Sequence, residues 1–289
     1  MTFADLYPFE PHYFTHADGI RQHYVDEGAG ETIVMLHGNP TWSFFYRDLI
    51  KRFRGERRVI VPDHIGMGLS DKPQAYPYRL ERHIANLDAL LRQAAPEGKI
   101  TLVMHDWGGA IAMGWATEHI NRVARLVILN TAAFPFPRIP LRINVCRIPG
   151  FGALAIRGLN AFAGLATLMT TVKPLTPEVR RGFLKPYNNW ENRIATLRFV
   201  QDIPMSPTHP SFARLKTISD KLPQLAEIPM LIQWGGKDWC FDDFFYEEWV
   251  KRFPRAELGY YGDAGHYLLE DNGEEIGARI AAFFAKNPG

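Results

Sequence analysis

The chain has 289 residues, 46% of them apolar, and a formal net charge of +2. This length and composition fit one large globular domain, or a domain with an insertion, with enough apolar residues for a sizeable core. The near-neutral charge and the scattered Lys and Arg residues argue against a nucleic-acid-binding protein. The densest basic cluster, at residues 51–58, is typical of a solvated helix end.

The cysteine content and the apolar segments bear on the compartment. Cys146 and Cys240 provide no disulfide framework and indicate a reducing environment. The first residues contain neither the basic segment nor the apolar run of a secretory signal. Residues 151–172 are nearly apolar, but Arg157, Asn160 and several glycines make them a poor transmembrane helix. We therefore expect a cytoplasmic protein without a transmembrane segment, whose composition allows self-association without requiring it.

Predicted strands alternate with predicted helices along most of the chain. Two early segments flank Ala-Asp-Gly and predict a hairpin, and six further short runs rich in β-branched residues predict strands. The strands are expected at 13–16, 20–26, 32–37, 58–62, 100–106, 124–130, 229–234 and 256–261. Helices are expected at about 43–53 and 80–94, after residue 106, and from the last strand to residue 284. This alternation predicts an α/β fold with a mostly parallel eight-stranded sheet and helices on both faces.

A long segment interrupts the alternation. From about residue 134 to residue 222, prolines are dense at first and helical periodicity replaces the strands. Almost ninety residues with many apolar positions need a core of their own, which argues against a surface excursion. We predict a helical cap at 134–222, inserted into a core domain made of residues 1–133 and 223–289.

The segment that organises the rest of the chain runs from Ile100 to Met113. An apolar strand ends at Asp106, Gly108 and Gly109 follow, and apolar residues then recur at helical spacing. This pattern predicts a strand, a tight turn and a helix, and α/β-hydrolases carry their nucleophile at the tip of such a turn. An aspartate there attacks carbon without a general base and forms an alkyl ester. Taken alone, Asp106 could equally be the N-cap of the helix.

Three more polar residues come directly after other predicted strands: Asn39, Asp238 and His266. Because the carboxyl ends of parallel strands meet at one edge of a sheet, these residues are expected to converge on Asp106. Nucleophile, acid and then histidine is the chain order of an α/β-hydrolase triad. Alone, Asp238 would be a turn residue and His266 an ordinary loop histidine. Their joint placement predicts the triad Asp106–His266–Asp238.

At this point the chain resembles the haloalkane dehalogenases over nearly its whole length. The loop with Asn39 and the pair Asp106-Trp107 are the specific part of the resemblance, whereas the matching stretch Pro62–Pro73 is shared by many α/β-hydrolases. Met104 departs from the usual elbow, where serine hydrolases have glycine. The matching stretches are His37–Ser43, Pro62–Pro73, His105–Gly109 and Asp263–Tyr267.

The resemblance implies how the leaving group is held. In that family the tryptophan after the nucleophile and either a loop asparagine or a cap tryptophan donate to the halide, so Asn39 and Trp107 are the expected donors. Their backbone N–H groups are expected to form the oxyanion hole. One branch of the family has a glutamate after the strand that here ends at Asn130. No carboxylate occurs at 126–137, so Asp238 is the expected acid.

This combination is similar to the third branch of the family, which also includes the β-lactone decarboxylases of long-chain olefin biosynthesis. The first implied function is haloalkane dehalogenation: Asp106 displaces the halide, and His266, oriented by Asp238, activates water against the ester. The expected partners are a small apolar organic substrate, water and a halide ion. No metal or organic cofactor is expected.

Three further functions stay open. The β-lactone decarboxylase reaction would use the same residues, and the stretches 186–193 and 199–204 are similar to those enzymes. An epoxide hydrolase is kept open by Tyr187, since such enzymes hold the epoxide oxygen with cap tyrosines. A non-catalytic binding protein of this fold would often lack a triad member, and none is missing here. Trp107 argues against a fluoroacetate dehalogenase, which has arginine at that position.

Overall fold

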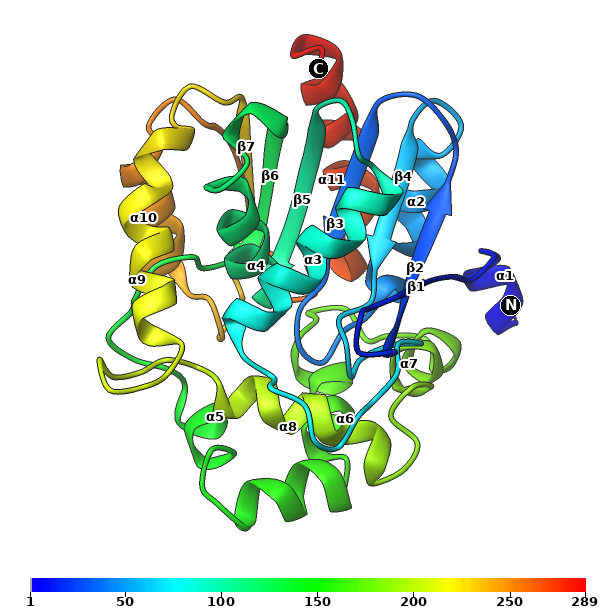
Figure 1. Ribbon diagram of the computed structural model, residues 1–289, viewed down its shortest axis with the longest axis vertical. Helices are drawn as coiled ribbons and strands as arrows, with labels where there is room; N and C mark the ends of the chain where they lie inside the picture. Colours follow the sequence, from blue (N-terminus) through cyan, green and yellow to red (C-terminus); the bar gives the residue numbers. More distant parts are fainter. Residues whose placement is uncertain (1) are drawn as a thin grey trace.

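The computed structural model describes residues 2–289, and its centre is an eight-stranded sheet (Figure 1). The strand order is β1-β2-β4-β3-β5-β6-β7-β8. β1 and β2 form the predicted hairpin, β2 is antiparallel to β4, and every other pair is parallel, which confirms the predicted mostly parallel sheet. The strands are β1 His12–Thr15, β2 Arg21–Glu27, β3 Thr32–Leu36, β4 Arg58–Pro62, β5 Ile100–Asp106, β6 Val123–Thr131, β7 Met230–Gly235 and β8 Glu257–Tyr261.

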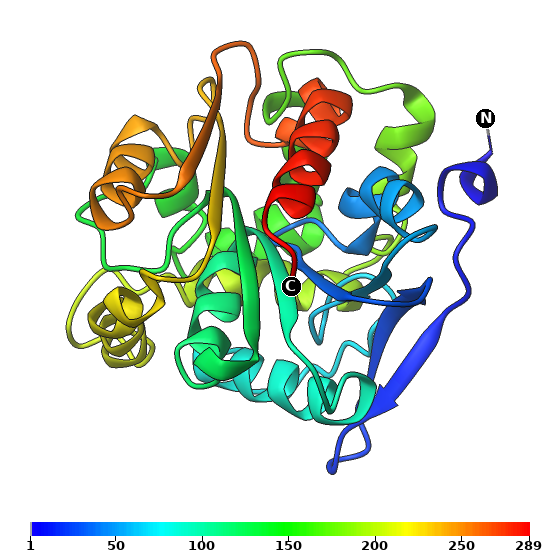
Figure 2. The same cartoon turned by 90° about the horizontal axis from the view of Figure 1, so that it is seen from above.

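Helices cover both faces of this sheet (Figure 2). Residues of α3, α4, α9 and α10 pack on one face, and residues of α2 and α11 pack on the other. Among residues 2–289, no helix is both long enough and apolar enough to cross a lipid bilayer. The helices are α1 Phe3–Leu6, α2 Arg47–Phe53, α3 Leu80–Ala94, α4 Trp107–Ala116, α5 Leu141–Val145, α6 Ala161–Met169, α7 Pro177–Leu184, α8 Ile194–Gln201, α9 Phe212–Lys221, α10 Asp243–Arg252 and α11 Leu268–Lys286.

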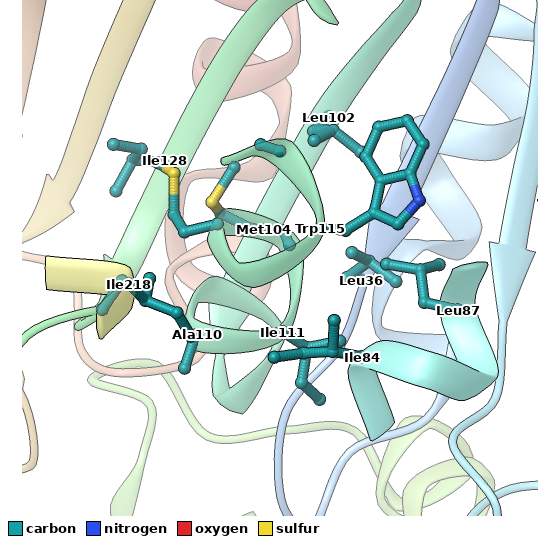
Figure 3. Packing of buried hydrophobic residues seen from close by; sticks show 14 of the residues in the cluster. Leu36, Ile84, Leu87, Leu102, Met104, Ala110, Ile111, Trp115, Ile128 and Ile218 are labelled. Atoms are coloured by element: carbon teal, nitrogen blue, oxygen red, sulfur yellow. The ribbon is translucent and has the colours of Figure 1, made fainter. Parts of the chain in front are cut away.

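The central strand and the helix that follows it are buried together. Every residue of β5 is buried, because the strand has neighbours on both edges and helices on both faces. Leu102 and Met104 point toward α4, where Ile111 and Trp115 lie beside them in the same apolar cluster (Figure 3). The cluster continues through side chains of β3, α3 and α9, including Leu36, Ile84, Leu87 and Ile218. Asp106 at the end of β5 therefore sits on a rigid, closely packed support.

Only helices and loops lie between β6 and β7 in the described chain. They are α5 to α9 with a π-helical turn at Ala153–Gly158, and α5, α6 and α8 lie at the end of the molecule away from the C-terminus (Figure 1). Helix α9, the last α-helix of this segment, packs on α4 through Leu215 and Ile218. It thus joins the apolar core on the face of the sheet that α4 covers. The division into a core and a cap at 134–222 remains a prediction.

Candidate active site

Asp106 occupies a sharp turn between β5 and α4. Its backbone has φ 51° and ψ −126°, a conformation that costs energy for a residue with a Cβ. The turn brings α4 so close to β3 that a Cβ on Gly108 would collide with the carbonyl oxygens of Leu36 and His37. The Asp106 side chain makes no capping bond to α4, in contrast to a simple N-cap. Its carboxylate lies within reach of Asn39 and His266.

The structure brings the three predicted triad residues together. His266, in the loop between β8 and α11, has its Nε2 atom 3.8 Å from Oδ2 of Asp106. Its Nδ1 atom lies 2.8 Å from Oδ2 of Asp238, which follows β7. All three side chains are buried, with exposed fractions of 4–6%. The imidazole is thus bonded to the acid on one side and faces the aspartate of the turn on the other.

Asp238 is held by more partners than the sequence indicates. Its Oδ1 accepts the N–H groups of Cys240 at 2.6 Å and Phe241 at 3.1 Å. Its Oδ2 also accepts an N–H of the Asn130 amide at 2.9 Å. Asn130, near the end of β6, additionally bridges to the backbone of Gly235 in both directions. Sequence reasoning missed this residue, and its only signal was a polar side chain at the end of an apolar strand.

Burial and neighbouring charges set the protonation of the site. Burial raises the pKa of the Asp106 carboxyl above its ordinary value, and His266 with the N–H groups of Asn39 and Trp107 opposes that rise. Burial lowers the pKa of His266, but the adjacent Asp238 and Asp106 carboxylates outweigh it, so this pKa lies above its ordinary value. The site therefore favours the charged imidazolium to a higher pH than an ordinary histidine would.

Asn39 and Trp107 both lie close to the nucleophile. The backbone N–H of Asn39 donates to Oδ1 of Asp106 at 2.7 Å. The Asn39 side-chain amide donates one N–H to the carbonyl of Thr196 in α8 at 3.1 Å. The amide has a second N–H, which this hydrogen bond does not use. Trp107 lines the pocket that Asp106 faces, and its ring packs edge-on against the ring of Phe199. Both residues are therefore near the carboxylate that the sequence predicts at the centre of the site.

One large pocket is lined by Asp106, Asn39, Trp107 and His266. Its empty volume is about 1270 Å³, part of it open to solvent. Arg142 is the only Lys or Arg among the residues that line it. The wall is otherwise mostly apolar and comes from segments next to the sheet and from α5, α6 and the end of α8. It includes Leu80, Phe136, Ile139, Ile143, Phe162, Leu165, Met169, Val200, Phe241 and Phe245. Such a wall suits an apolar ligand.

Across residues 2–289, no group of three or more His, Cys, Asp or Glu side chains is arranged to hold a metal ion. Two buried histidines, His105 and His23, have protein partners instead. The Nε2–H of His105 donates to the carbonyl oxygen of His266, 2.9 Å away, and burial keeps the pKa of His105 well below its ordinary value. His23 bonds Asp63 through Nδ1 at 2.8 Å.

Known proteins share this fold. The alpha/beta hydrolase fold family matches residues 31–273. The chain belongs to the α/β hydrolase family. This α/β hydrolase is 43% identical to the cis-3-alkyl-4-alkyloxetan-2-one decarboxylase of Shewanella oneidensis, over 97% of this chain and 90% of that protein. It is also 43% identical to the enzyme of the same name from Xanthomonas campestris, over 98% of both.

The same α/β hydrolase is more distantly related to dehalogenases. Its identity to haloalkane dehalogenase 2 of Mycobacterium tuberculosis is 31%, over 96% of both chains. The crystal structure of a putative ancestral haloalkane dehalogenase matches with a TM-score of 0.87 at 27% identity, over 95% of this chain and 98% of that one. The resemblance to this family, and to the branch that includes β-lactone decarboxylases, is therefore confirmed.

Proposed function

We propose that this α/β hydrolase is a β-lactone decarboxylase that converts cis-3,4-dialkyl-oxetan-2-ones into alkenes and carbon dioxide. From the sequence alone, dehalogenation ranks first and this reaction second. The observation that reverses the order is the 43% identity, over almost the whole chain, to two proteins named as cis-3-alkyl-4-alkyloxetan-2-one decarboxylases. The large apolar pocket supports the proposal, because the substrate carries two alkyl chains on a small polar ring.

In the first step of the proposed mechanism, Asp106 attacks the ring carbon that carries the lactone oxygen. The carbon–oxygen bond of the strained ring breaks, and its electron pair leaves with the oxygen as a carboxylate. The product is an alkyl ester on Asp106 with a free carboxylate on the neighbouring carbon. The Asp106 side chain is buried, and a desolvated carboxylate is a stronger nucleophile than one in water.

In the second step carbon dioxide leaves from the neighbouring carbon. The electron pair of the broken carbon–carbon bond forms the double bond, and the ester oxygen departs with its own pair, which restores the Asp106 carboxylate. This route consumes no water and needs no general base. His266, held by Asp238, would then contribute positive charge beside the carboxylates instead of activating water.

The leaving carboxylate is negatively charged, so donors should surround it. The second amide N–H of Asn39 and the indole N–H of Trp107 are proposed to donate to it, as they would to a halide. The backbone N–H groups of Asn39 and Trp107 would stabilise charge on the Asp106 carboxylate, or on an oxyanion when an ester there is hydrolysed. A hydrogen bond to a charged group contributes about 1.5–3 kcal/mol.

Haloalkane dehalogenation is the second candidate function, and the His266–Asp238 pair favours it. An alkyl ester formed from a haloalkane has no carboxylate to lose, so it must be hydrolysed. His266, oriented through Nδ1 by Asp238, would activate the water for that step. We therefore expect both activities from one site, with alkene formation the faster.

An epoxide hydrolase and a non-catalytic binding protein have weaker support. The Tyr187 hydroxyl donates to the carbonyl of Thr41 at 3.2 Å, and Tyr187 is absent from the wall of the pocket. It is therefore badly placed to hold an epoxide oxygen. A non-catalytic binding role would leave the close approach of Asp106, His266 and Asp238 without a purpose. Cytoplasmic location and self-association remain predictions.

The test is to incubate the purified protein with a long-chain cis-β-lactone and, in parallel, with terminal bromoalkanes. Alkene protons should appear in the NMR spectrum, which avoids the thermal decarboxylation that a hot injection port would cause. Bromide release should also be detectable, with a lower kcat/KM. Heat-inactivated protein and Asp106→Asn serve as controls. Bromide release that exceeds alkene formation by orders of magnitude would return dehalogenation to first place, and neither activity would contradict both proposals.

A further inference from the structure

The segment between β6 and α7 has an unusual distribution of charge. Residues 131–177 contain no Asp or Glu, but they contain five basic residues. These are Arg138, Arg142, Arg147, Arg157 and Lys173. The whole chain has 31 acidic and 33 basic residues, so a stretch of this length without an acid is a marked local bias. We call residues 131–177 the basic segment.

The basic segment also exposes large apolar side chains. Nine of the fourteen large apolar residues that are exposed in residues 2–289 belong to it, with exposed fractions from 39% for Met169 to 76% for Leu141 and Leu159. These nine are Leu141, Ile148, Phe151, Leu154, Leu159, Leu165, Leu168, Met169 and Val172. They are carried by α5, the π-helical turn, α6 and the loops beside them, at the end of the molecule away from the C-terminus (Figure 1). Soluble surfaces seldom gather so many without a partner.

The exposed apolar surface is continuous with the pocket of the candidate active site. Leu165 and Met169 are both exposed and part of the pocket wall. Arg142 also lines the pocket, and its guanidinium lies 4.0 Å from the centre of the Trp239 ring. An apolar molecule that leaves a hydrocarbon phase at this face could therefore enter the pocket over apolar side chains.

The charges decide which partner fits this face. Arg138 pairs with Asp242, but within residues 2–289 Arg142, Arg147 and Arg157 form no ion pair with a carboxylate. A second copy of the chain docked through the same face would place basic residues against basic residues, which opposes association. An anionic lipid surface offers negative headgroups to the arginines and hydrocarbon to the leucines.

We propose that the basic segment docks the protein on an anionic lipid surface, with α5, the π-helical turn and α6 facing the lipid. A further consequence, which rests on the proposed function, is that long-chain substrate passes from the lipid phase into the pocket at this face. The helices lie in the interface and do not cross it, as expected for short elements with apolar and basic side chains mixed.

Co-sedimentation of the full-length protein with vesicles tests the docking without any substrate. Vesicles of mixed phosphatidylglycerol and phosphatidylcholine should carry the protein down at low salt, and pure phosphatidylcholine or high salt should weaken this binding. The double variant Leu159→Gln/Leu168→Gln should bind roughly tenfold or more weakly, because two exposed leucines no longer enter the lipid. Neither residue lines the pocket.

The matched control is Leu258→Gln on the edge strand β8, where an exposed leucine lies outside the basic segment. It should bind vesicles as the wild type does, and thermal unfolding should show that all variants are folded. No binding to anionic vesicles, or equal binding by the double variant, would overturn the proposal. The proposal would also be overturned if vesicle binding is absent and light scattering shows that the wild type self-associates but the double variant does not.

The route of the substrate is tested separately. With β-lactone supplied in anionic vesicles, the double variant should be several-fold slower than the wild type, and with β-lactone in detergent micelles the two should be equal. Equal rates from vesicles would overturn the entry route. Absence of turnover in micelles would instead contradict the proposed function, and the sedimentation result would still decide the docking.

Discussion

At the scale of single residues, the two distances around His266 differ in a way that fits covalent chemistry on aspartate. Its Nδ1 is bonded to Asp238 at 2.8 Å, whereas its Nε2 is 3.8 Å from Asp106. A serine nucleophile must give its proton to the histidine, so the two need a hydrogen bond. A carboxylate has no proton to give. A wider gap leaves room beside Nε2 for another molecule, such as the water that would hydrolyse an ester.

The first prediction concerns the proposed nucleophile. Asp106→Asn is nearly isosteric and should abolish both alkene formation and bromide release while the protein remains folded. Activity within tenfold of the wild type, a barrier change of only about 1.4 kcal/mol, would be too small for the loss of a nucleophile. Intact-protein mass spectrometry must exclude deamidation back to aspartate.

The second prediction separates the two reactions through His266. His266→Ala should still form the ester with a bromoalkane but fail to hydrolyse it, so the added mass should accumulate on the peptide that contains Asp106. With a β-lactone, departure of carbon dioxide frees Asp106, so turnover should continue. Accumulation of a stable adduct from the β-lactone would contradict the waterless second step.

The third prediction is the pH dependence. His266 must be neutral to act as a base, and its pKa is raised above the ordinary 6.5, so bromide release should increase with pH through a midpoint above 6.5. Alkene formation needs only an ionised Asp106, whose pKa is raised from 3.8. Its acid limb should therefore lie at lower pH than the limb for bromide release. Identical profiles for the two substrates would mean that the same group limits both.

At the scale of elements, the turn between β5 and α4 is the part that tolerates least change. It combines a positive φ at Asp106 with a close approach of α4 to the end of β3 at Gly108. Because β5 and α4 are packed on every side, the surrounding core can hold this conformation in place. The orientation of the nucleophile is thus maintained by neighbours that have no chemical role.

The fourth prediction tests that close approach with two glycine substitutions. Gly108→Ala should destabilise the fold strongly, because the added Cβ would collide with backbone oxygens that cannot move aside. Gly164→Ala in α6 is the matched control, since no atom lies within 4 Å of its added Cβ. It should stabilise the helix by about 0.5–1 kcal/mol. Urea unfolding of both variants provides the comparison, and similar stabilities would show that the turn can relax.

Most elements could be predicted from the sequence because their apolar patterns are strong. The strand at 58–62 and the helix at 80–94 have the predicted bounds, and the parallel pairing of most strands follows from their alternation with helices. The predicted helix at 43–53 is instead a 3-10 turn, Ser43–Tyr46, followed by α2. The helix α10, after Asp238, was not predicted, although Phe245, Trp249 and Phe253 recur at helical spacing.

The candidate site was predictable where a polar residue follows a strand, which holds for Asp106, Asp238 and His266. Asn130 was not identified because an asparagine at a strand end is typical of a turn, and its hydrogen bond to Asp238 joins β6 to the loop after a different strand, β7. The packing of α9 on α4 could also not be predicted, because a helical sequence pattern does not show which other element the helix will contact. Such long-range partners appear only in three dimensions.

At the scale of the whole molecule, one end of the sheet carries the candidate site and the opposite end anchors the C-terminus. The candidate site lies at the carboxyl ends of the strands. At the start of β6, the buried Arg125 donates to Thr101 of β5 at 2.9 Å, to Glu31 at 2.6 Å and to the carbonyl of Asn287 at 2.6 Å. It thereby ties the C-terminus to the strands at the end opposite the pocket.

The fifth prediction follows from that arrangement. Arg125→Met should destabilise the protein by about 2 kcal/mol, because buried Thr101 and two partly buried acceptors lose their donor, and should leave kcat unchanged. The control is Arg92→Met, which removes an exposed pair with Asp88 within α3 and should cost less than about 0.5 kcal/mol. Urea unfolding and rate measurements on both variants test this, and equal stabilities would mean that Arg125 contributes little to holding the C-terminus.

The order of the strands in the chain has a consequence during synthesis on the ribosome. Asp106 and the pocket residues of α5 and α6 are made first, whereas Asp238 and His266 come only with residues 230–289, which add β7 and β8 to one side of the sheet. A nascent chain therefore carries the exposed leucines of residues 131–177 before the sheet is complete. That interval is when the growing polypeptide is most open to aggregation, and when a chaperone has most to shield.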